Sequence, residues 1–300
     1  MAARPGIPGG SPRMVALALA VLALVAGRPA ASYAQSPPDG AVAVPWRPGN
    51  FQRFQLGSPD EDGRRAEQGA LWVKIVRPAG PGPFPFVVLL HGCGGLSAPA
   101  MWSQWVVPWA ALFAAHGIGT AVVDSFGPRG VAQVCRSKVA VWARRRADDA
   151  YSVRTWLAQQ SYVDGDRIAV MGMSNGGRTV LAALRTDLSH AAPFRAGIAL
   201  YPGCQSDGEA RFYAPLLVLV GRGDQVTPAA ACERMQTAQP AGSSLRLVVY
   251  PDAPHTFDMD LVDRTTLGMR LGHDAEATAD ARKRVIGFLA AQGIGDGRPD

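Results

Sequence analysis

The chain has 300 residues, of which 48% are hydrophobic and 18% charged, with a formal net charge of +6. This composition can bury a sizeable core and excludes a disordered chain, and four cysteines are too few for a disulfide-scaffolded miniprotein. Half of the charge comes from Arg4, Arg13 and Arg28, which leaves a net charge of only +3 after residue 34 and predicts no nucleic-acid partner.

The N-terminal segment has the three parts of an export signal. An uninterrupted apolar run at residues 14–27 follows Arg4 and Arg13, and a small-x-small sequence ends at Ala34. The run is short for a membrane span. We therefore predict that residues 1–34 are a signal peptide, that the protein is secreted or periplasmic, and that it has no membrane contact after cleavage. An uncleaved N-terminal anchor is the alternative.

The next segment, residues 35–70, is polar and rich in Pro, Gly and Gln, and we expect a lead-in with little regular structure. Beyond it, apolar runs alternate with helical patterns. Strands are expected at residues 71–76, 86–90, 119–124, 168–171, 196–200, 216–220 and 245–250. Helices are expected at residues 102–115, 139–159, 175–188, 228–239 and 274–291, the first of them kinked or split by Pro108.

These strands lack the polar alternation of a half-exposed sheet, and helices separate most of them. Such a pattern predicts an α/β fold with a mostly parallel central sheet and helices on both faces. The sequence has no internal repeat, and its amino-acid composition does not change along this part of the chain, so we expect one α/β domain at residues 71–295.

A G-x-S-x-G sequence centred on Ser174 lies between an expected strand and an expected helix. Gly172 and Gly176 permit the strained strand–turn–helix geometry of a nucleophile elbow, which exposes the serine hydroxyl. The helix N-terminus that follows favours developing negative charge. We predict that Ser174 is a catalytic nucleophile.

A serine nucleophile needs a base and an acid that orients the base. Asp224 follows the strand at 216–220, and His255 follows the strand at 245–250, which gives the chain order serine, aspartate, histidine. Asp207 is the second-choice acid. The remaining histidines, His116, His190 and His273, are expected at the surface. Asp252, Asp258 and Asp260 are near His255 in the sequence, but Asp224 alone follows a strand with a turn suited to reaching an imidazole.

A glycine-rich turn, His-Gly-Cys-Gly-Gly, follows the strand at 86–90 and can point backbone N–H groups at a substrate carbonyl oxygen. We predict an oxyanion hole made by the N–H groups of Cys93 and Asn175, with Gly94 as the alternative to Cys93. Nothing beside Cys93 would lower its pKa, so we expect a buried or disulfide-bonded thiol there.

Export changes the interpretation of the four cysteines. In an oxidising compartment they suggest two disulfides, and the absence of a C-x-x-C spacing argues against a metal site. Of the three pairings we favour Cys93–Cys135 with Cys204–Cys232, because the fold brings each pair to loops at one end of the sheet. We predict neither a metal nor a cofactor.

Other side chains admit two interpretations. Residues 144–146 are three arginines followed by Asp148 and Asp149, and a solvated helix face is preferred over a polyanion site. Arg129 and Arg178 could bind a substrate carboxylate, but surface salt bridges are preferred. The pocket is expected beside an aromatic-rich stretch, Phe126 and Tyr201. For the tryptophans of that stretch, Trp102, Trp105 and Trp109, a position in the core is preferred over a substrate-binding role.

Together these residues resemble the dienelactone hydrolase-like branch of the α/β-hydrolase superfamily. The matching segments, in family order, are FVVLLHGCGGL, AVVDSFGPRG, DRIAVMGMSNGG, LLVLVGRGDQVTP and YPDAPHTFD. The resemblance implies an α/β-hydrolase fold and an esterase or lactonase that uses Ser174 as nucleophile, His255 as base and Asp224 as orienting acid. The founding dienelactone hydrolases carry a cysteine where this chain has Ser174.

The predicted reaction is hydrolysis of a small-molecule ester or lactone through an acyl-enzyme. One alternative is a serine peptidase of the prolyl-oligopeptidase type, which shares the triad order but has a gating domain. The other is a non-catalytic binding module that keeps a hydrolase fold. The sequence predicts neither the acyl and alcohol groups of the substrate nor the oligomeric state.

Overall fold

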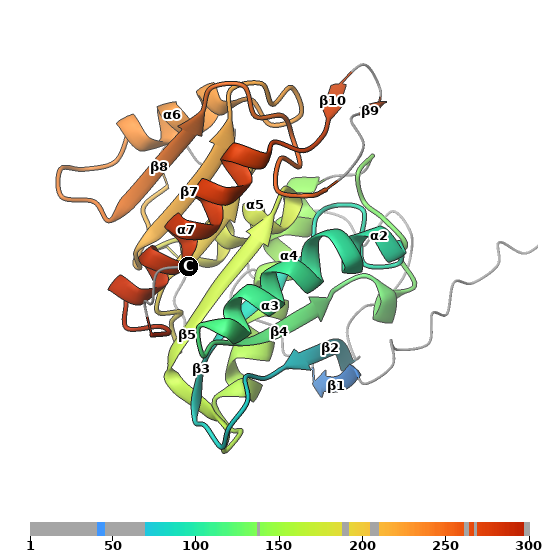
Figure 1. Ribbon diagram of the computed structural model, residues 1–300, viewed down its shortest axis with the longest axis vertical. Coiled ribbons are helices and arrows are strands. Elements are labelled where there is room, and N and C mark those ends of the chain that lie inside the picture. The colour runs from blue at the N-terminus through green and yellow to red at the C-terminus, as the bar shows by residue number, and fades with distance from the viewer. Residues whose placement is uncertain are drawn as a thin grey trace, which may run out of the picture. The chain divides into compact units, whose positions relative to one another are not determined.

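Eight strands form one sheet in the computed structural model, which describes residues 41–45, 70–136, 139–187, 192–204, 210–260, 264–266 and 269–296 (Figure 1). In spatial order the strands are β1 (Ala41–Pro45), β2 (Ala70–Val76), β4 (Gly119–Asp124), β3 (Phe84–Leu90), β5 (Val163–Met173), β6 (Gly197–Leu200), β7 (Leu216–Gly221) and β8 (Leu245–Tyr250). From β4 to β8 all pairs are parallel, whereas β2 runs antiparallel to both of its neighbours. The predicted mostly parallel sheet is confirmed.

Helices cover both faces of this sheet. The described helices are α2 (Pro99–Met101), the π-helical η2 (Trp102–Val106), α3 (Val107–Ala115), the 3-10 turn η3 (Gly127–Arg129), α4 (Val139–Leu157), α5 (Asn175–Ala183), α6 (Ala229–Thr237) and α7 (Ala275–Ala291). A hairpin of β9 (Arg264–Thr266) and β10 (Met269–Leu271) lies apart from the main sheet (Figure 1).

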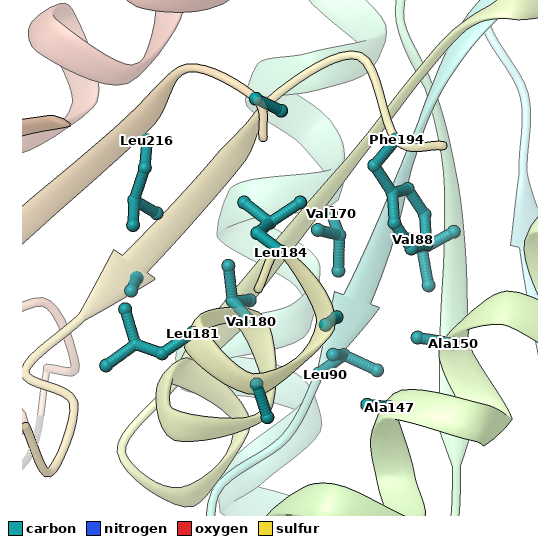
Figure 2. Packing of buried hydrophobic residues seen from close by; sticks show 14 of the residues in the cluster. Val88, Leu90, Ala147, Ala150, Val170, Val180, Leu181, Leu184, Phe194 and Leu216 are labelled. Carbon is teal, nitrogen blue, oxygen red and sulfur yellow. The ribbon is translucent and has the colours of Figure 1, made fainter. Parts of the chain in front are cut away.

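Alternate residues of each central strand enter two separate hydrophobic cores. Val88 and Leu90 of β3 pack with α4, α5 and α6 on one face, where Val180 and Leu184 contact the strands (Figure 2). Val87 and Leu89 point the other way and pack with α3 and α7. Burial on both faces is the reason that the strands are continuous apolar runs in the sequence.

The helix expected at residues 102–115 is divided just before Pro108, as predicted, into η2 and α3. The chain stays helical from Pro99 to Ala115, and a five-residue π-helical segment immediately precedes the α3 turn that contains Pro108. A proline has no N–H to donate to the preceding turn, and the wider π-helical turn absorbs the missing bond.

Other boundaries differ from the expected ones because of tertiary pairing. Strand β5 begins five residues earlier than expected because Val163 pairs with Phe84. Helix α5 ends at Ala183 because the following residues bond to a neighbouring segment, with Tyr213 N–H donating to Leu184 O. The β9–β10 hairpin was not expected, and β1 lies in the segment for which we expected little regular structure. The rest of residues 1–69 lies outside the described chain.

Candidate active site

Ser174 lies at a sharp turn between β5 and α5. Its backbone has φ 51° and ψ −115°, a left-handed conformation that a residue with a side chain rarely adopts. A Cβ on Gly172 would lie 2.3 Å from the Gly176 carbonyl carbon, and one on Gly176 would lie 2.1 Å from Leu90 O. The two glycines therefore allow the strained turn that the G-x-S-x-G sequence predicted.

His255 lies between Ser174 and Asp224, and the three loops that carry them follow β5, β7 and β8. Its Nε2 is 3.0 Å from Ser174 Oγ, and its Nδ1 is 2.7 Å from Asp224 Oδ2. Because a carboxylate can only accept, Nδ1 carries the proton, and Nε2 is left to accept from the Ser174 hydroxyl. The side chains of His255 and Asp224 are buried. This geometry can take a proton from Ser174 as the serine attacks an electrophilic carbon.

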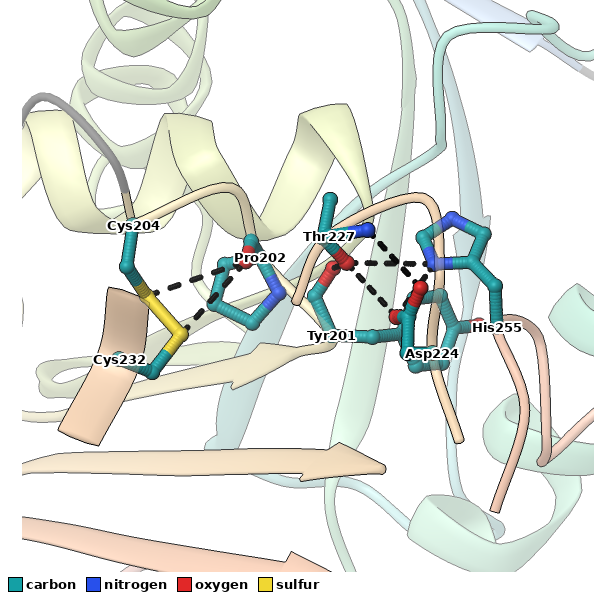
Figure 3. The surroundings of a disulfide bond; sticks show 7 residues. All are labelled: Tyr201, Pro202, Cys204, Asp224, Thr227, Cys232 and His255. Carbon is teal, nitrogen blue, oxygen red and sulfur yellow. Dashed lines mark hydrogen bonds and ion pairs between the residues drawn. A yellow bond between two sulfur atoms is a disulfide. The ribbon is translucent and has the colours of Figure 1, made fainter. Parts of the chain in front are cut away.

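The Asp224 carboxylate receives hydrogen bonds on both oxygens. Oδ1 accepts from the backbone N–H groups of Val226 and Thr227, each at 2.8 Å, and Oδ2 is 2.7 Å from Thr227 Oγ1. Thr227 Oγ1 also lies 3.0 Å from Tyr201 O and 3.3 Å from His255 Nδ1 (Figure 3). No sequence expectation singles out Thr227, although an aspartate three residues before Thr-Pro at a helix start is a signal for such a turn.

The glycine-rich turn that contains Cys93 lies against the serine. A Cβ on Gly92 would be 3.6 Å from Ser174 Cβ. Gly95 N–H donates to Gly92 O at 3.3 Å, and Cys93 O accepts from Val134 N–H at 2.8 Å. Cys93 therefore lies beside the elbow, and Asn175 is the first residue of α5, but an oxyanion-binding role for their N–H groups remains a prediction.

His91 is fully buried at the start of this turn. Its Nδ1 is 2.7 Å from Gly92 O, and a carbonyl oxygen can only accept, so Nδ1 carries a proton. Burial, together with the positive charge of Arg146, lowers the pKa of His91 well below its usual value. The imidazole is therefore neutral at physiological pH and acts as a donor within the turn.

Arg146 corrects the prediction of a solvated face at residues 144–146. Its side chain is fully buried, as are Asp148 and Asp149, and only Arg144 is exposed. Burial lowers the pKa of Arg146 to about 10, and the guanidinium remains charged at neutral pH. Composition alone could not locate this group, because adjacent positions on one helix point in different directions.

Both expected disulfide pairs are present in the structure. Cys93–Cys135 joins the turn beside Ser174 to the loop before α4, with Cα atoms 4.9 Å apart. Cys204–Cys232 joins the loop after β6 to α6, with Cα atoms 5.1 Å apart, next to Pro202 and the Thr227 turn (Figure 3). No free cysteine is present in the described chain.

The remaining histidines and the second-choice acid have varied environments. His116 is buried and lies 3.2 Å from Asp296, so the expected surface position is wrong. His273 is partly exposed and 4.0 Å from Asp260. His190 and Asp207 lie outside the described residues.

The predicted carboxylate-binding and pocket residues serve mainly in the core. Arg129 forms a bidentate ion pair with buried Asp149, with Nη1–Oδ2 and Nη2–Oδ1 distances of 2.9 and 2.7 Å, in place of the expected surface salt bridge. Trp105 and Trp109 are fully buried and do not line an open pocket. Within the described residues, no group of three or more His, Cys, Asp or Glu is placed to hold a metal ion, and no helix is long and apolar enough to span a membrane.

Comparison with known proteins identifies a family for this chain. The family model of the dienelactone hydrolase family matches residues 73–293. A protein of Methylorubrum extorquens provisionally named carboxymethylenebutenolidase is 32% identical over 144 residues, which cover 44% of this chain and 45% of that protein. The chain thus matches less than half the length of this curated relative.

Solved structures share the fold at low identity. A provisionally named dienelactone hydrolase from Klebsiella pneumoniae matches with a TM-score of 0.59 and 20% identity, over 75% of this chain and 94% of that one. Thermogutta terrifontis esterase 2 matches with a TM-score of 0.58 and 18% identity, over 89% and 98%. A puromycin hydrolase matches with a TM-score of 0.58 and 20% identity, over 89% of this chain and 42% of that one.

These likenesses confirm the α/β-hydrolase fold, and the family model covers most of the described residues. The chain belongs to the dienelactone hydrolase family.

Proposed function

We propose that this protein is an exported serine hydrolase that cleaves a small-molecule carboxylic ester or lactone through an acyl-enzyme. The observation that carries the proposal is the hydrogen-bonded series Ser174, His255 and Asp224, with distances of 3.0 and 2.7 Å. The strained φ of Ser174 and the adjacent glycine-rich turn add to it. The family relationship supports hydrolysis, and the serine at the elbow distinguishes this chain from founding members with cysteine.

The mechanism follows from the two hydrogen bonds of His255. Nε2 takes the Ser174 proton as Oγ attacks the carbonyl carbon, and Asp224 stabilises the imidazolium that forms. The N–H groups of Cys93 and Asn175 donate to the oxyanion of the tetrahedral intermediate. His255 then protonates the leaving alkoxide, and a water molecule activated by the same imidazole hydrolyses the acyl-enzyme.

The decisive experiment compares Ser174→Ala with Ser103→Ala, a matched control on the exposed surface of η2. We expect wild type and Ser103→Ala to hydrolyse p-nitrophenyl acetate and Ser174→Ala to lose at least about a thousandfold in kcat/KM. A fluorophosphonate probe should label Ser174. Paraoxon is a second probe, because it phosphorylates the Thermogutta terrifontis esterase.

Three outcomes would contradict the proposal. Unchanged turnover in Ser174→Ala would remove the serine from the mechanism. A folded wild type that neither turns over esters nor reacts with the probe would favour a binding module. Cleavage of a peptide amide with little ester activity would favour a peptidase.

Export is the second part of the proposal, and the two disulfides support it because such bonds persist in oxidising compartments. Sequencing the N-terminus of protein recovered outside the cytoplasm should give a chain that begins at Gln35. Recovery of full-length chain in the membrane fraction would favour the uncleaved anchor.

A further inference from the structure

Arg146 is a buried cation that the proposed acyl transfer does not use directly. It belongs to α4, which packs against α5, and its side chain is fully buried. A guanidinium in such a place loses its hydration and is retained only where its hydrogen bonds replace the lost water. Its bonding partners therefore indicate what it does.

The partners of Arg146 belong to the two segments on either side of the serine. Nη1 donates to Asn175 Oδ1 and Nη2 donates to His91 O, each at 2.7 Å. Asn175 directly follows the serine, and His91 is two residues before Cys93. One planar guanidinium thus spans the two segments that carry the expected oxyanion donors.

The hydrogen bond from Arg146 to His91 O influences the orientation of the Cys93 N–H through the backbone and side chain of His91. Arg146 holds the carbonyl of His91, and the His91 imidazole donates to Gly92 O at 2.7 Å. Gly92 O and Cys93 N–H belong to the same planar trans peptide and point in opposite directions. Fixing the Gly92 carbonyl therefore fixes the direction in which Cys93 N–H points.

We propose that Arg146 is a positioning residue that holds the Cys93 turn and the start of α5 in the relative arrangement required to bind the oxyanion. The inference rests on the proposed serine hydrolase function. Arg146 does not touch substrate in this role, and it acts through His91 and Asn175. For this role the two N–H donors of the planar guanidinium are more important than its charge, because a single ammonium group cannot make both bonds in one plane.

The test uses Arg146→Lys, Arg146→Met and a matched control, Arg144→Met, which removes a neighbouring exposed arginine of α4. For both Arg146 variants we expect kcat for p-nitrophenyl acetate to fall about ten- to a hundredfold, while KM changes less than about threefold. Arg144→Met should behave as wild type. Circular dichroism and thermal melting show which variants are folded at the assay temperature.

A trifluoromethyl ketone gives a readout that a merely structural role would not move. Its adduct with Ser174 carries an oxyanion like that of the tetrahedral intermediate. Its inhibition constant should therefore rise by the same factor as kcat/KM falls across the Arg146 variants. Binding of the corresponding alcohol, which forms no adduct, should stay within about twofold.

If the Arg146 variants do not fold, Asn175→Leu and Asn175→Asp replace them, since only aspartate keeps an acceptor for Nη1. Asn175→Asp should then be at least about tenfold more active than Asn175→Leu. Wild-type kinetics in folded Arg146→Met, or equal activity of the two Asn175 variants, would overturn the inference. An inactive wild type would instead refute the proposed function, and the two failures are therefore distinguishable.

Discussion

The ring of Tyr201 lies edge-to-face against the imidazole of His255, with ring centroids 4.7 Å apart and an interplanar angle of 65°. The hydroxyl of the same tyrosine donates to Asp258 Oδ1 at 2.6 Å. Asp258 Oδ2 accepts from the indole N–H groups of Trp105 and Trp109 at 3.0 and 2.8 Å. A buried carboxylate three residues after His255 thus anchors the loop that carries the imidazole to the core around η2 and α3.

Asp258 should make stability depend on pH. Burial raises its pKa above the ordinary value of 3.8, although three donors act in the opposite direction. The folded state therefore holds this proton more tightly than the unfolded state, and the contribution of Asp258 to the free energy of unfolding falls as pH rises from about 3.8 through the raised pKa. Urea unfolding of wild type and Asp258→Asn across pH 3–8 measures the difference, which should change only in that window.

Two controls accompany that measurement. In Asp258→Asn the amide oxygen can accept from both indoles and the amide N–H can donate to the tyrosine oxygen, so the network persists without charge. Asp258→Ala leaves three buried donors without an acceptor and should lower the free energy of unfolding by about 3 kcal/mol or more. A pH-independent difference between wild type and Asp258→Asn would show that Asp258 titrates normally.

Asp224→Asn should reduce kcat strongly while leaving the fold intact. An asparagine can turn its amide N–H toward His255 Nδ1, which favours the tautomer that carries its proton on Nε2 and cannot accept from Ser174. We expect a loss of about a thousand- to ten-thousandfold in kcat, with KM nearly unchanged. Steady-state kinetics with p-nitrophenyl acetate checks this, and a loss below about tenfold would contradict the orienting role.

The two disulfides should differ in how readily they are reduced. Cys135 is exposed, whereas Cys204 and Cys232 are buried. Because exchange requires a thiolate to reach a sulfur atom, mild reductant followed by alkylation should label Cys93 and Cys135 first. Peptide mass mapping at increasing reductant concentration gives the order, and simultaneous labelling of all four cysteines in folded protein would be the contrary result.

Loss of each disulfide should also lower stability. The bonds close loops with sequence separations of 42 and 28 residues. A chain-entropy account gives about 3–4 kcal/mol for each. Urea unfolding of Cys93→Ser/Cys135→Ser and Cys204→Ser/Cys232→Ser measures this, with fully oxidised wild type as the reference.

Glycine-to-alanine substitutions at two helical positions should have opposite effects. A Cβ on Gly176 would lie 2.1 Å from Leu90 O, so Gly176→Ala forces backbone apart at the serine turn and should abolish ester hydrolysis. Gly287 in α7 is exposed, and a Cβ added there would have no atom within 4 Å apart from its chain neighbours and the backbone of its own helix. Gly287→Ala should raise the free energy of unfolding by about 0.5–1 kcal/mol without changing kcat, as thermal melting and the ester assay will test.

The sequence predicted the fold because its signals are local and repeated. Adjacent residues carry the signal for each element. The largely apolar sequences of β3, β7 and β8 indicate buried strands, and the G-x-S-x-G sequence indicates a turn. The predicted ends of helices and strands are less accurate where a distant segment offers other hydrogen-bond partners. Helix α5 ends at Ala183 because the residues after it bond to residues 211–213 and do not continue the helix.

The sequence by itself determined the α/β architecture and the chain order of Ser174, Asp224 and His255, because strand ends and turn residues mark where loops must lie. Only the tertiary structure decided that Arg146 is buried, that Thr227 lies against Tyr201 and His255, and that Asp258 accepts from two tryptophans and a tyrosine. Those contacts join residues of segments that lie far apart in the sequence. The hydrophobic periodicity of one segment does not predict which residues of another segment it will contact.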